Sequence, residues 1–254
     1  MTPRGTFIIN GSEYSLGNQL RLRPGVFTRI KESGEAESHV NVLPGGGISH
    51  RIHLDPESGV FSLNVAQSKT PLVSLLKAMG VKDAELQKAW GNDLFAANIK
   101  KSDPRAIDKL YSKLVRNPPG ERSADEKTKV VADLFLAMKL DPEVTSRTLG
   151  KPLDKVSPES ILASTRRLLA VHKGEEDPDD RDSLAFQTLL GPEDLISERV
   201  KTAARVLRPL LWKTTFNKNL SKIQPGFLNR HVLGAITSSG LGQSLEEVNF
   251  ADIF

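Results

Sequence analysis

The sequence predicts an α+β protein whose strands lie in the first third of the chain and whose helices follow them. Two short segments, 48–54 and 61–65, alternate apolar and polar residues, which is typical of half-buried strands. From residue 82 onward the apolar residues instead recur at the spacing of amphipathic helices. Hydrophobic residues make up 38% of the chain and charged residues 26%, a composition that supports a globular core.

Composition narrows the class of protein without identifying it. The formal net charge of +4 permits contact with a polyanion but is also common in soluble enzymes. The chain has no cysteine, which excludes disulfides and thiolate metal sites and suits a reducing cytoplasm. No apolar run reaches the length of a membrane span, and Met1 to Arg4 lacks the pattern of a signal peptide. We therefore expect a soluble cytoplasmic protein.

The segment from Gly5 to Phe27 combines a strand with a basic turn. The apolar run 6–9 is followed by Asn10-Gly11, a pair that favours a tight turn. A polar stretch then leads to Arg21 and Arg23, which we expect on a loop closed by Pro24-Gly25. This loop is expected to present two guanidinium groups from a rigid turn.

A polar loop, a hairpin and a helix are expected next. Residues 29–38 are charged and contain Gly34, which predicts an exposed loop. Segments 48–54 and 61–65 flank a turn at 55–59 and predict a β-hairpin with one apolar and one polar face. Thr70 is a good N-cap for a helix that carries Pro71 in its first turn and ends at Gly80.

Helical spacing dominates the rest of the chain. The expected helices cover 82–90, 104–116, 121–140, 161–172, 193–216 and 227–236. Ser157-Pro158-Glu159 opens the fourth of these, Gly174 ends it, and Pro209 kinks the fifth. The run 117–120 is the strongest helix breaker and marks a plausible subdomain boundary.

Several clusters of charged, glycine or histidine residues could be functional sites, but each also has a purely structural explanation. The acidic run 175–182 has the oxygen ligands that Mg²⁺ prefers, yet it lacks a phosphate-binding loop and fits a solvated segment better. Gly45-Gly46-Gly47 precedes a strand and not a helix, so it predicts a flexible turn. His50 and His53 lie on opposite faces of one strand and cannot share a metal. The basic residues of the fifth helix could contact phosphates or could simply form a solvated face, and the two interpretations fit equally well. These residues are Arg199, Lys201, Arg205 and Arg208.

Four sequence blocks, taken in order, carry a family resemblance. They are GTFIING at 5–11 with PGVF at 24–27, the hairpin and helix at 48–80, the run 168–182, and the segment 238–249. Together they resemble the β subunit of bacterial-type multisubunit DNA-dependent RNA polymerase. Arg181 and Ser183 stand where that family usually has isoleucine and histidine, and Ser244 stands where it has phenylalanine. Without the family, 238–249 predicts only a glycine-flanked loop and the start of a helix.

The resemblance implies a protrusion and a shortened lobe. Residues 1–80 correspond to the first, β-rich part of the protrusion, 81–174 to a reduced helical lobe-like region, and 175–254 to helices that return to the protrusion and begin the RNA path. The implied role is to shape the main cleft and to position template DNA and nascent RNA. The implied partners are the remaining part of β, the catalytic large subunit, DNA and RNA, with no membrane. No cofactor is expected in this chain, because the Mg²⁺ of such a polymerase belongs to another subunit.

The resemblance also points to particular residues. Those expected to bind nucleic acid are Arg21, Arg23, Gln243, Ser244, Glu246 and Asn249. Those that correspond to the rifamycin pocket of the family are Val26, Leu241 and Gln243. No catalytic or metal-binding residue is expected, so the chain should be inactive alone.

Two other classes of protein stay open at this stage. A free-standing nucleic-acid-binding protein that has borrowed this fold must gather several phosphate contacts by itself, so its binding should depend steeply on salt. A purely structural assembly module should bind no nucleic acid.

Overall fold

The computed structural model describes residues 2–9, 11–115, 122–198, 201, 208 and 242–245. The contacts between residues divide the chain into two compact units. One unit comprises 22–187, and the other comprises 1–21 together with 188–254. The three-part division at residues 80 and 174 stays a prediction.

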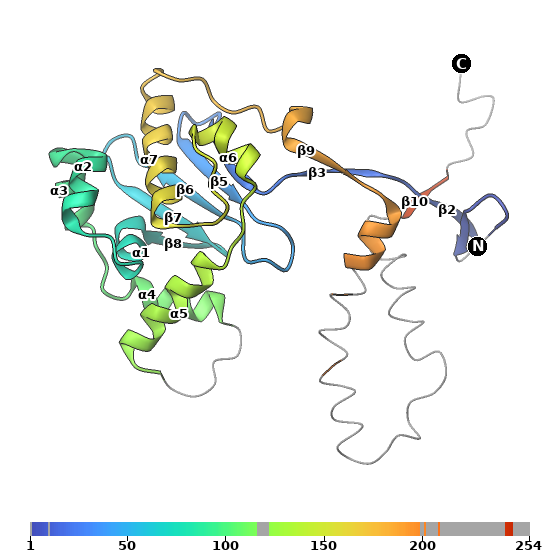
Figure 1. Cartoon of the computed structure of the whole chain (residues 1–254), viewed down its shortest axis with the longest axis horizontal. Helices are drawn as coiled ribbons and strands as arrows, with labels where there is room; N and C mark the ends of the chain where they lie inside the picture. Colours follow the sequence, from blue (N-terminus) through green and yellow to red (C-terminus); the bar gives the residue numbers. More distant parts are fainter. Residues whose placement is uncertain are drawn as a thin grey trace, which may run out of the picture. The chain divides into compact units, whose positions relative to one another are not determined.

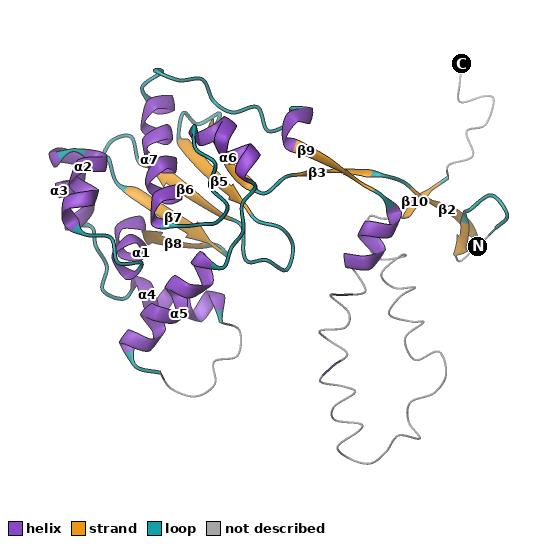
Figure 2. Ribbon diagram, in the orientation of Figure 1, coloured by secondary structure: helices purple, strands orange, loops and turns teal. Residues whose placement is uncertain are grey.

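The unit 22–187 is built on a five-stranded antiparallel sheet (Figures 1 and 2). Its strands adjoin in sequence order: β4 (Gly25–Ile30), β5 (Ala36–Asn41), β6 (His50–Leu54), β7 (Phe61–Val65) and β8 (Ser68–Pro71). The turn between β7 and β8 consists of Ala66 and Gln67, with φ of 46° and 66°. Positive φ at both central residues is what a two-residue type I′ hairpin requires.

Helices cover one face of this sheet. They are α1 (Leu72–Ala78), α2 (Asp83–Trp90), α3 (Asn92–Lys100), α4 (Ala106–Leu114), α5 (Ala124–Leu136), α6 (Pro142–Leu149) and α7 (Pro158–His172), followed by the 3₁₀ turn η1 (Leu184–Phe186). Helix α7 packs against β4, β5 and β6 (Figure 1). Its first turn is capped reciprocally, because Ser157 N–H donates to Ser160 Oγ at 2.8 Å and Ser160 N–H donates to Ser157 Oγ at 3.3 Å.

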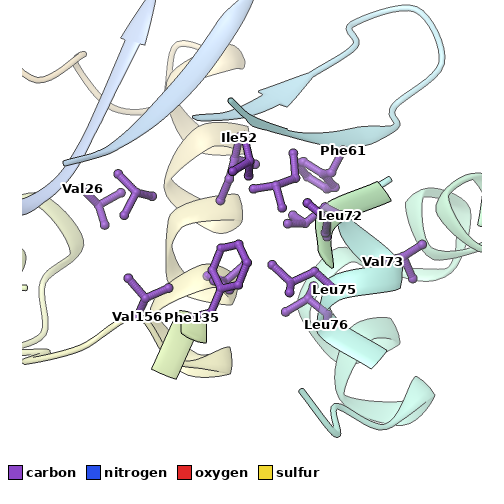
Figure 3. Close-up of a cluster of buried hydrophobic side chains, with 14 of the residues drawn as sticks. Val26, Ile52, Phe61, Leu72, Val73, Leu75, Leu76, Phe135 and Val156 are labelled. Atoms are coloured by element: carbon purple, nitrogen blue, oxygen red, sulfur yellow. The ribbon is translucent and has the colours of Figure 1, made fainter. Parts of the chain in front are cut away.

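The hydrophobic core lies between the helices and one face of the sheet, which we call the core face. Its central row across β4 to β8 reads Thr28, Ser38, Ile52, Leu63 and Thr70. Figure 3 shows Ile52 and Phe61 from the sheet near Leu72 and Leu75 of α1 and Phe135 of α5, all of them fully buried. This packing fixes which face of each strand is apolar.

The opposite side of the sheet, which we call the charged face, carries Arg29, Glu37, Arg51, His53 and Lys69. Glu37 is fully buried there, and its Oε1 accepts from Arg29 Nε at 2.6 Å. Lys31 Nζ lies 3.4 Å from Glu37 Oε2. Burial raises the pKa of Glu37, but the hydrogen bond and charge of Arg29, with the charges of Arg51 and Lys31, outweigh it, so the net shift is downward.

The other unit joins strands from both ends of the chain. Strand β2 (Ser12–Leu16) pairs antiparallel with β1 (Phe7–Ile9) and with β10 (Gly242–Ser244). A helix covers 192–198. A separate two-stranded sheet consists of β3 (Gln19–Leu22) and β9 (Gln187–Leu190). Next to that sheet, Arg23 N–H donates to the carbonyl of Phe186 at 2.8 Å.

The coarse fold prediction is confirmed. The described residues form an α+β structure, with a strand at 7–9, the 50–65 hairpin, and helices beginning at Asp83, Ala106, Ala124 and Pro158. Helices α3 and α6 were not predicted. The breaker 117–120, most of the 193–216 helix and the 227–236 helix lie outside the described residues. The protrusion and lobe assignments stay predictions.

The predicted loop at 29–38 is too long, because β4 and β5 form a hairpin there and only residues 31–35 between them are a turn. Charged residues misled the prediction, since Arg29 and Glu37 point to the charged face and pair with each other across the strands. Thr70 is not an N-cap either: it lies in β8, and Pro71 occupies the N-cap position of α1. Residues 242–244 form strand β10 and not a loop or helix start.

The predicted basic loop is shorter than expected and consists of Arg23 and Pro24 between β3 and β4. Arg21 lies in β3, and Gly25 begins β4 in an extended conformation. Glycine is needed at position 25 for space and not for a turn, since a Cβ atom there would lie 2.3 Å from Val144 Cγ1 of α6.

Candidate nucleic-acid interface

Arg23 is held by two carboxylates at the N-terminal end of α6. Its Nε donates to Asp141 Oδ2 at 2.9 Å, and its Nη2 donates to Glu143 Oε2 at 2.7 Å. The backbone supports this arrangement, because Asp141 N–H donates to the carbonyl of Pro24 at 3.1 Å. Asn41 Nδ2 donates to the carbonyl of Arg23 at 3.0 Å. The side chain is therefore fixed where the chain passes into β4.

These contacts set the charge at this position. The hydrogen bond from Arg23 to Glu143 raises the pKa of the guanidinium, and that to Asp141 adds to the rise, while burial opposes both. The Arg23 side chain also lowers the pKa of Glu143. These shifts favour the charged forms of Arg23 and Glu143, and a phosphate must compete with both carboxylates for this guanidinium.

Arg21 belongs to the other unit and is paired in the same manner. Its Nη1 donates to Glu198 Oε2 at 2.6 Å, and each side chain is 30% exposed. One described carboxylate holds Arg21 whereas two hold Arg23, so the Arg21 pair can exchange for a phosphate at lower cost.

Gln243 lies in β10 and its side chain is exposed. The strand register sets it opposite Ser15 of β2, and sets Ser244 opposite Tyr14. The chain after β10 stays on the same edge, because Leu245 N–H donates to the carbonyl of Glu13 at 2.9 Å.

The remaining predicted residues are placed as follows. Val26 lies in β4, pairs with Val40 and is 1% exposed within the core, so its part in an inhibitor pocket stays a prediction. Leu241, Glu246 and Asn249 lie outside the described residues. Lys201 and Arg208 are exposed, whereas Arg199 and Arg205 lie outside the described residues.

The structure therefore sorts the candidates into two groups. Arg21, Gln243 and Ser244 belong to the unit of 1–21 and 188–254, and Arg23 and Val26 belong to the unit 22–187. The partners of the arginines were not found from the sequence, since Asp141 and Glu198 lie 118 and 177 residues from Arg23 and Arg21. No local pattern signals contacts over such separations.

The acidic run 175–182 is a structural segment, as predicted. Asp179 Oδ2 accepts from Thr28 N–H at 2.7 Å, and Asp179 N–H donates to the Thr28 carbonyl, also at 2.7 Å. Arg167 Nη2 donates to Asp179 Oδ1 at 3.2 Å. Burial raises the pKa of Asp179 against these contacts. Asp179 thereby ties the segment after α7 to the edge of β4.

Neither a metal-binding cluster nor a membrane-spanning helix occurs among the described residues. Within the part of the chain that the structure describes, no three His, Asp or Glu side chains are grouped to hold a metal ion. His50 and His53 occupy opposite faces of β6, as predicted. No helix among the described residues is long and apolar enough to cross a bilayer.

Comparison with known proteins identifies the family. Residues 23–190 match the family described as RNA polymerase Rpb2, domain 2. The DNA-directed RNA polymerase subunit beta of Gloeobacter violaceus is 26% identical over 271 residues, and the same subunit of Cyanidium caldarium is 26% identical over 275 residues. Each alignment covers 98% of this chain but only 24% and 25% of the relative, so the chain spans about a quarter of their length. The chain belongs to the RNA polymerase Rpb2, domain 2 family and is similar throughout most of its length to β subunits of DNA-directed RNA polymerases.

Proposed function

We propose that this chain forms an N-terminal portion of the β subunit of a DNA-dependent RNA polymerase and acts in transcription as part of that enzyme. The observation that carries the proposal is the agreement between the family match, 23–190, and the compact unit, 22–187. A match that follows the boundaries of a folded unit supports a shared domain better than a short motif does.

Within the enzyme, we infer a positional role in the cytoplasm. The chain shapes the main cleft and helps to hold template DNA and nascent RNA, while another subunit binds the catalytic Mg²⁺ and nucleotidyl transfer occurs there. Gln243 is favoured over Arg23 as a nucleic-acid contact, because its amide is exposed whereas the guanidinium is held by Asp141 and Glu143.

Native co-purification tests the assignment. The tagged full chain is isolated from its source, its partners are identified by mass spectrometry, and the eluate is assayed for template-dependent nucleotide incorporation. Co-elution of a catalytic large subunit and the remaining β portion, with incorporation, supports the proposal. A chain that elutes alone and binds nucleic acid with steep salt dependence contradicts it and supports a free-standing binding protein.

A substitution in the assembled enzyme tests the RNA contact. Gln243→Ala should increase the release of short abortive transcripts, because an amide that hydrogen-bonds RNA is lost. Gln87→Ala is the matched control, since Gln87 is an exposed glutamine of α2. Equal abortive release from both variants rules out the role of Gln243.

A further inference from the structure

A groove runs along helix α7 on the unit 22–187, and Arg21, Arg23 and Gln243 are not among its lining residues. It has a volume of about 970 Å³. The end of α6, the segment 150–157 and the exposed side of α7 line it. Along α7 the lining extends from Pro158 to Ala170, which corresponds to roughly 18 Å of helix. A groove of this length can hold about three turns of a second helix.

The floor of the groove is apolar. It includes Leu149 from α6 with Leu162, Ala163 and Ala170 from α7, and all four side chains are half-buried. Leu149 and Leu162 also pack against the hydrophobic core. Ala163 and Ala170 lie seven residues apart on one side of α7, and Leu162 and Arg166 lie on the same side, so this stripe offers apolar side chains of a partner a packing surface with a cation in its middle.

The rim of the groove is mainly basic. Five of its lining residues are cationic, namely Arg147, Lys151, Lys155, Arg166 and Arg167, and three are anionic, namely Glu85, Glu159 and Glu176. Most of the cations already have partners, such as Glu159 for Lys151 at 2.8 Å and Glu143 for Arg147 at 3.1 Å. Lys155 and Arg166 are exposed, and no described residue forms an ion pair with either. The hydrogen bond from Lys151 lowers the pKa of Glu159 and the charge of Arg166 adds to that shift, but no described residue holds Lys155 or Arg166 in an ion pair, so both are available to an external anion.

We propose that this groove binds an acidic amphipathic helix of a partner protein. Apolar side chains of that helix pack on the α7 stripe, and its carboxylates pair with Lys155 and Arg166. A nucleic acid fits less well, because none of the described lining residues is aromatic and a phosphate backbone has no apolar side chains to pack on Leu149 and Leu162. The inference does not depend on the polymerase role, so either can fail without the other.

Peptide binding to the full chain tests the proposal. The probe is a fluorescein-labelled peptide of about four helical turns, with leucines along one face and glutamates on the other. Its binding is measured by fluorescence anisotropy. The double variant Lys155→Glu/Arg166→Glu should weaken its binding about tenfold, because two attractive contacts become repulsive. Lys129→Glu is the matched control, since Lys129 is exposed on α5 and outside the groove, and it should leave binding unchanged.

Three outcomes overturn the proposal. The first is equal binding by the wild type and the double variant, or no binding by the wild type. The second is equal binding by a peptide of the same composition whose leucines are scattered, because the apolar stripe is then not used. The third is displacement of the peptide by duplex DNA of equal charge, which indicates a phosphate-binding surface instead. Circular dichroism and thermal unfolding of each variant confirm that lost binding is not lost folding.

Discussion

The core face and the charged face of the five-stranded sheet each contain a fully buried side chain, and the two are stabilised by different means. Leu63 on the core face and Glu37 on the charged face are both fully buried. Burial stabilises Leu63 directly, in proportion to the apolar area removed from water. Burial of Glu37 is tolerated only because Arg29 and Lys31 supply opposite charge. The two faces should therefore respond differently to substitution and to pH.

The largest expected effect is on the core face. Leu63→Ala leaves a cavity in a central strand and should lower the free energy of unfolding by about 3 kcal/mol. Asn64→Ala, at the next position on the charged face, should lower it by less than about 1 kcal/mol. Urea unfolding of both variants measures the difference. Equal losses contradict the distinction between the faces.

Glu37→Gln should be the most damaging substitution on the charged face. It removes the carboxylate charge that Arg29 and Lys31 share, and should lower the free energy of unfolding by about 2 kcal/mol. The folded-state pKa of Glu37 lies below 4.5, so this contribution is present above pH 4.5 and is lost as the pH falls through the folded pKa. The gap between wild type and variant in urea unfolding should narrow accordingly; a gap that widens in acid disproves the assignment. Glu35→Gln, an exposed partner of Lys31, is the control and should change little.

His50 tests how the core face responds to acid. Burial lowers its pKa from 6.5 to about 4, and its ring lies 5.1 Å from that of Phe135. The unfolded chain binds a proton at higher pH than the folded chain, so stability is full above pH 6.5 and falls towards pH 4. One such group contributes a slope of up to roughly 1.4 kcal/mol per pH unit.

The matching variant is His50→Phe, which keeps the aromatic contact and removes the titrating group. Urea unfolding at several pH values should show a shallower slope for this variant. A residual slope is expected, because burial and the charge of Arg181 also lower the pKa of His39 to about 4. An unaltered slope in His50→Phe means that His50 is not the group that titrates.

The smallest effect concerns a polar pair within the core face. Thr28 Oγ1 and Ser38 Oγ are buried and lie 2.9 Å apart. Ser38→Ala leaves the Thr28 hydroxyl without this partner and should cost about 1 kcal/mol in thermal unfolding. The double variant Thr28→Val/Ser38→Ala should cost less than the sum of the two single variants, because no hydroxyl is then left unpaired. Strict additivity shows that the hydroxyls do not interact.

The sequence supported the prediction of elements whose signals are local. The 50–65 hairpin followed from alternation, and α7 followed from Ser157, Pro158 and the stop at Gly174, which has φ of 73°. The β4–β5 hairpin could not be predicted in this way, because its charged residues satisfy one another across strands and not with water. Gly25 was misinterpreted for a similar reason, since its role depends on contact with Val144 far along the chain.

The candidate interface was less predictable than the fold. Family resemblance placed Arg21, Arg23 and Gln243 in order along the sequence, but their pairing depends on tertiary contacts. Arg23 meets Asp141 and Glu143 only because α6 packs against β4. The groove on α7 could not be predicted from a sequence motif either. The α7 residues that line it have the pattern of an ordinary amphipathic helix.

The hydrogen bond between Arg23 and Phe186 brings the two ends of the unit 22–187 together. A domain whose ends meet can be lengthened, trimmed or exchanged like a cassette, since the distance that the flanking strands must bridge does not change with the size of the domain. Insertions and deletions within this domain could therefore be accepted without changes in the flanking strands β3 and β9. An engineer could likewise replace residues 23–186 with a short turn.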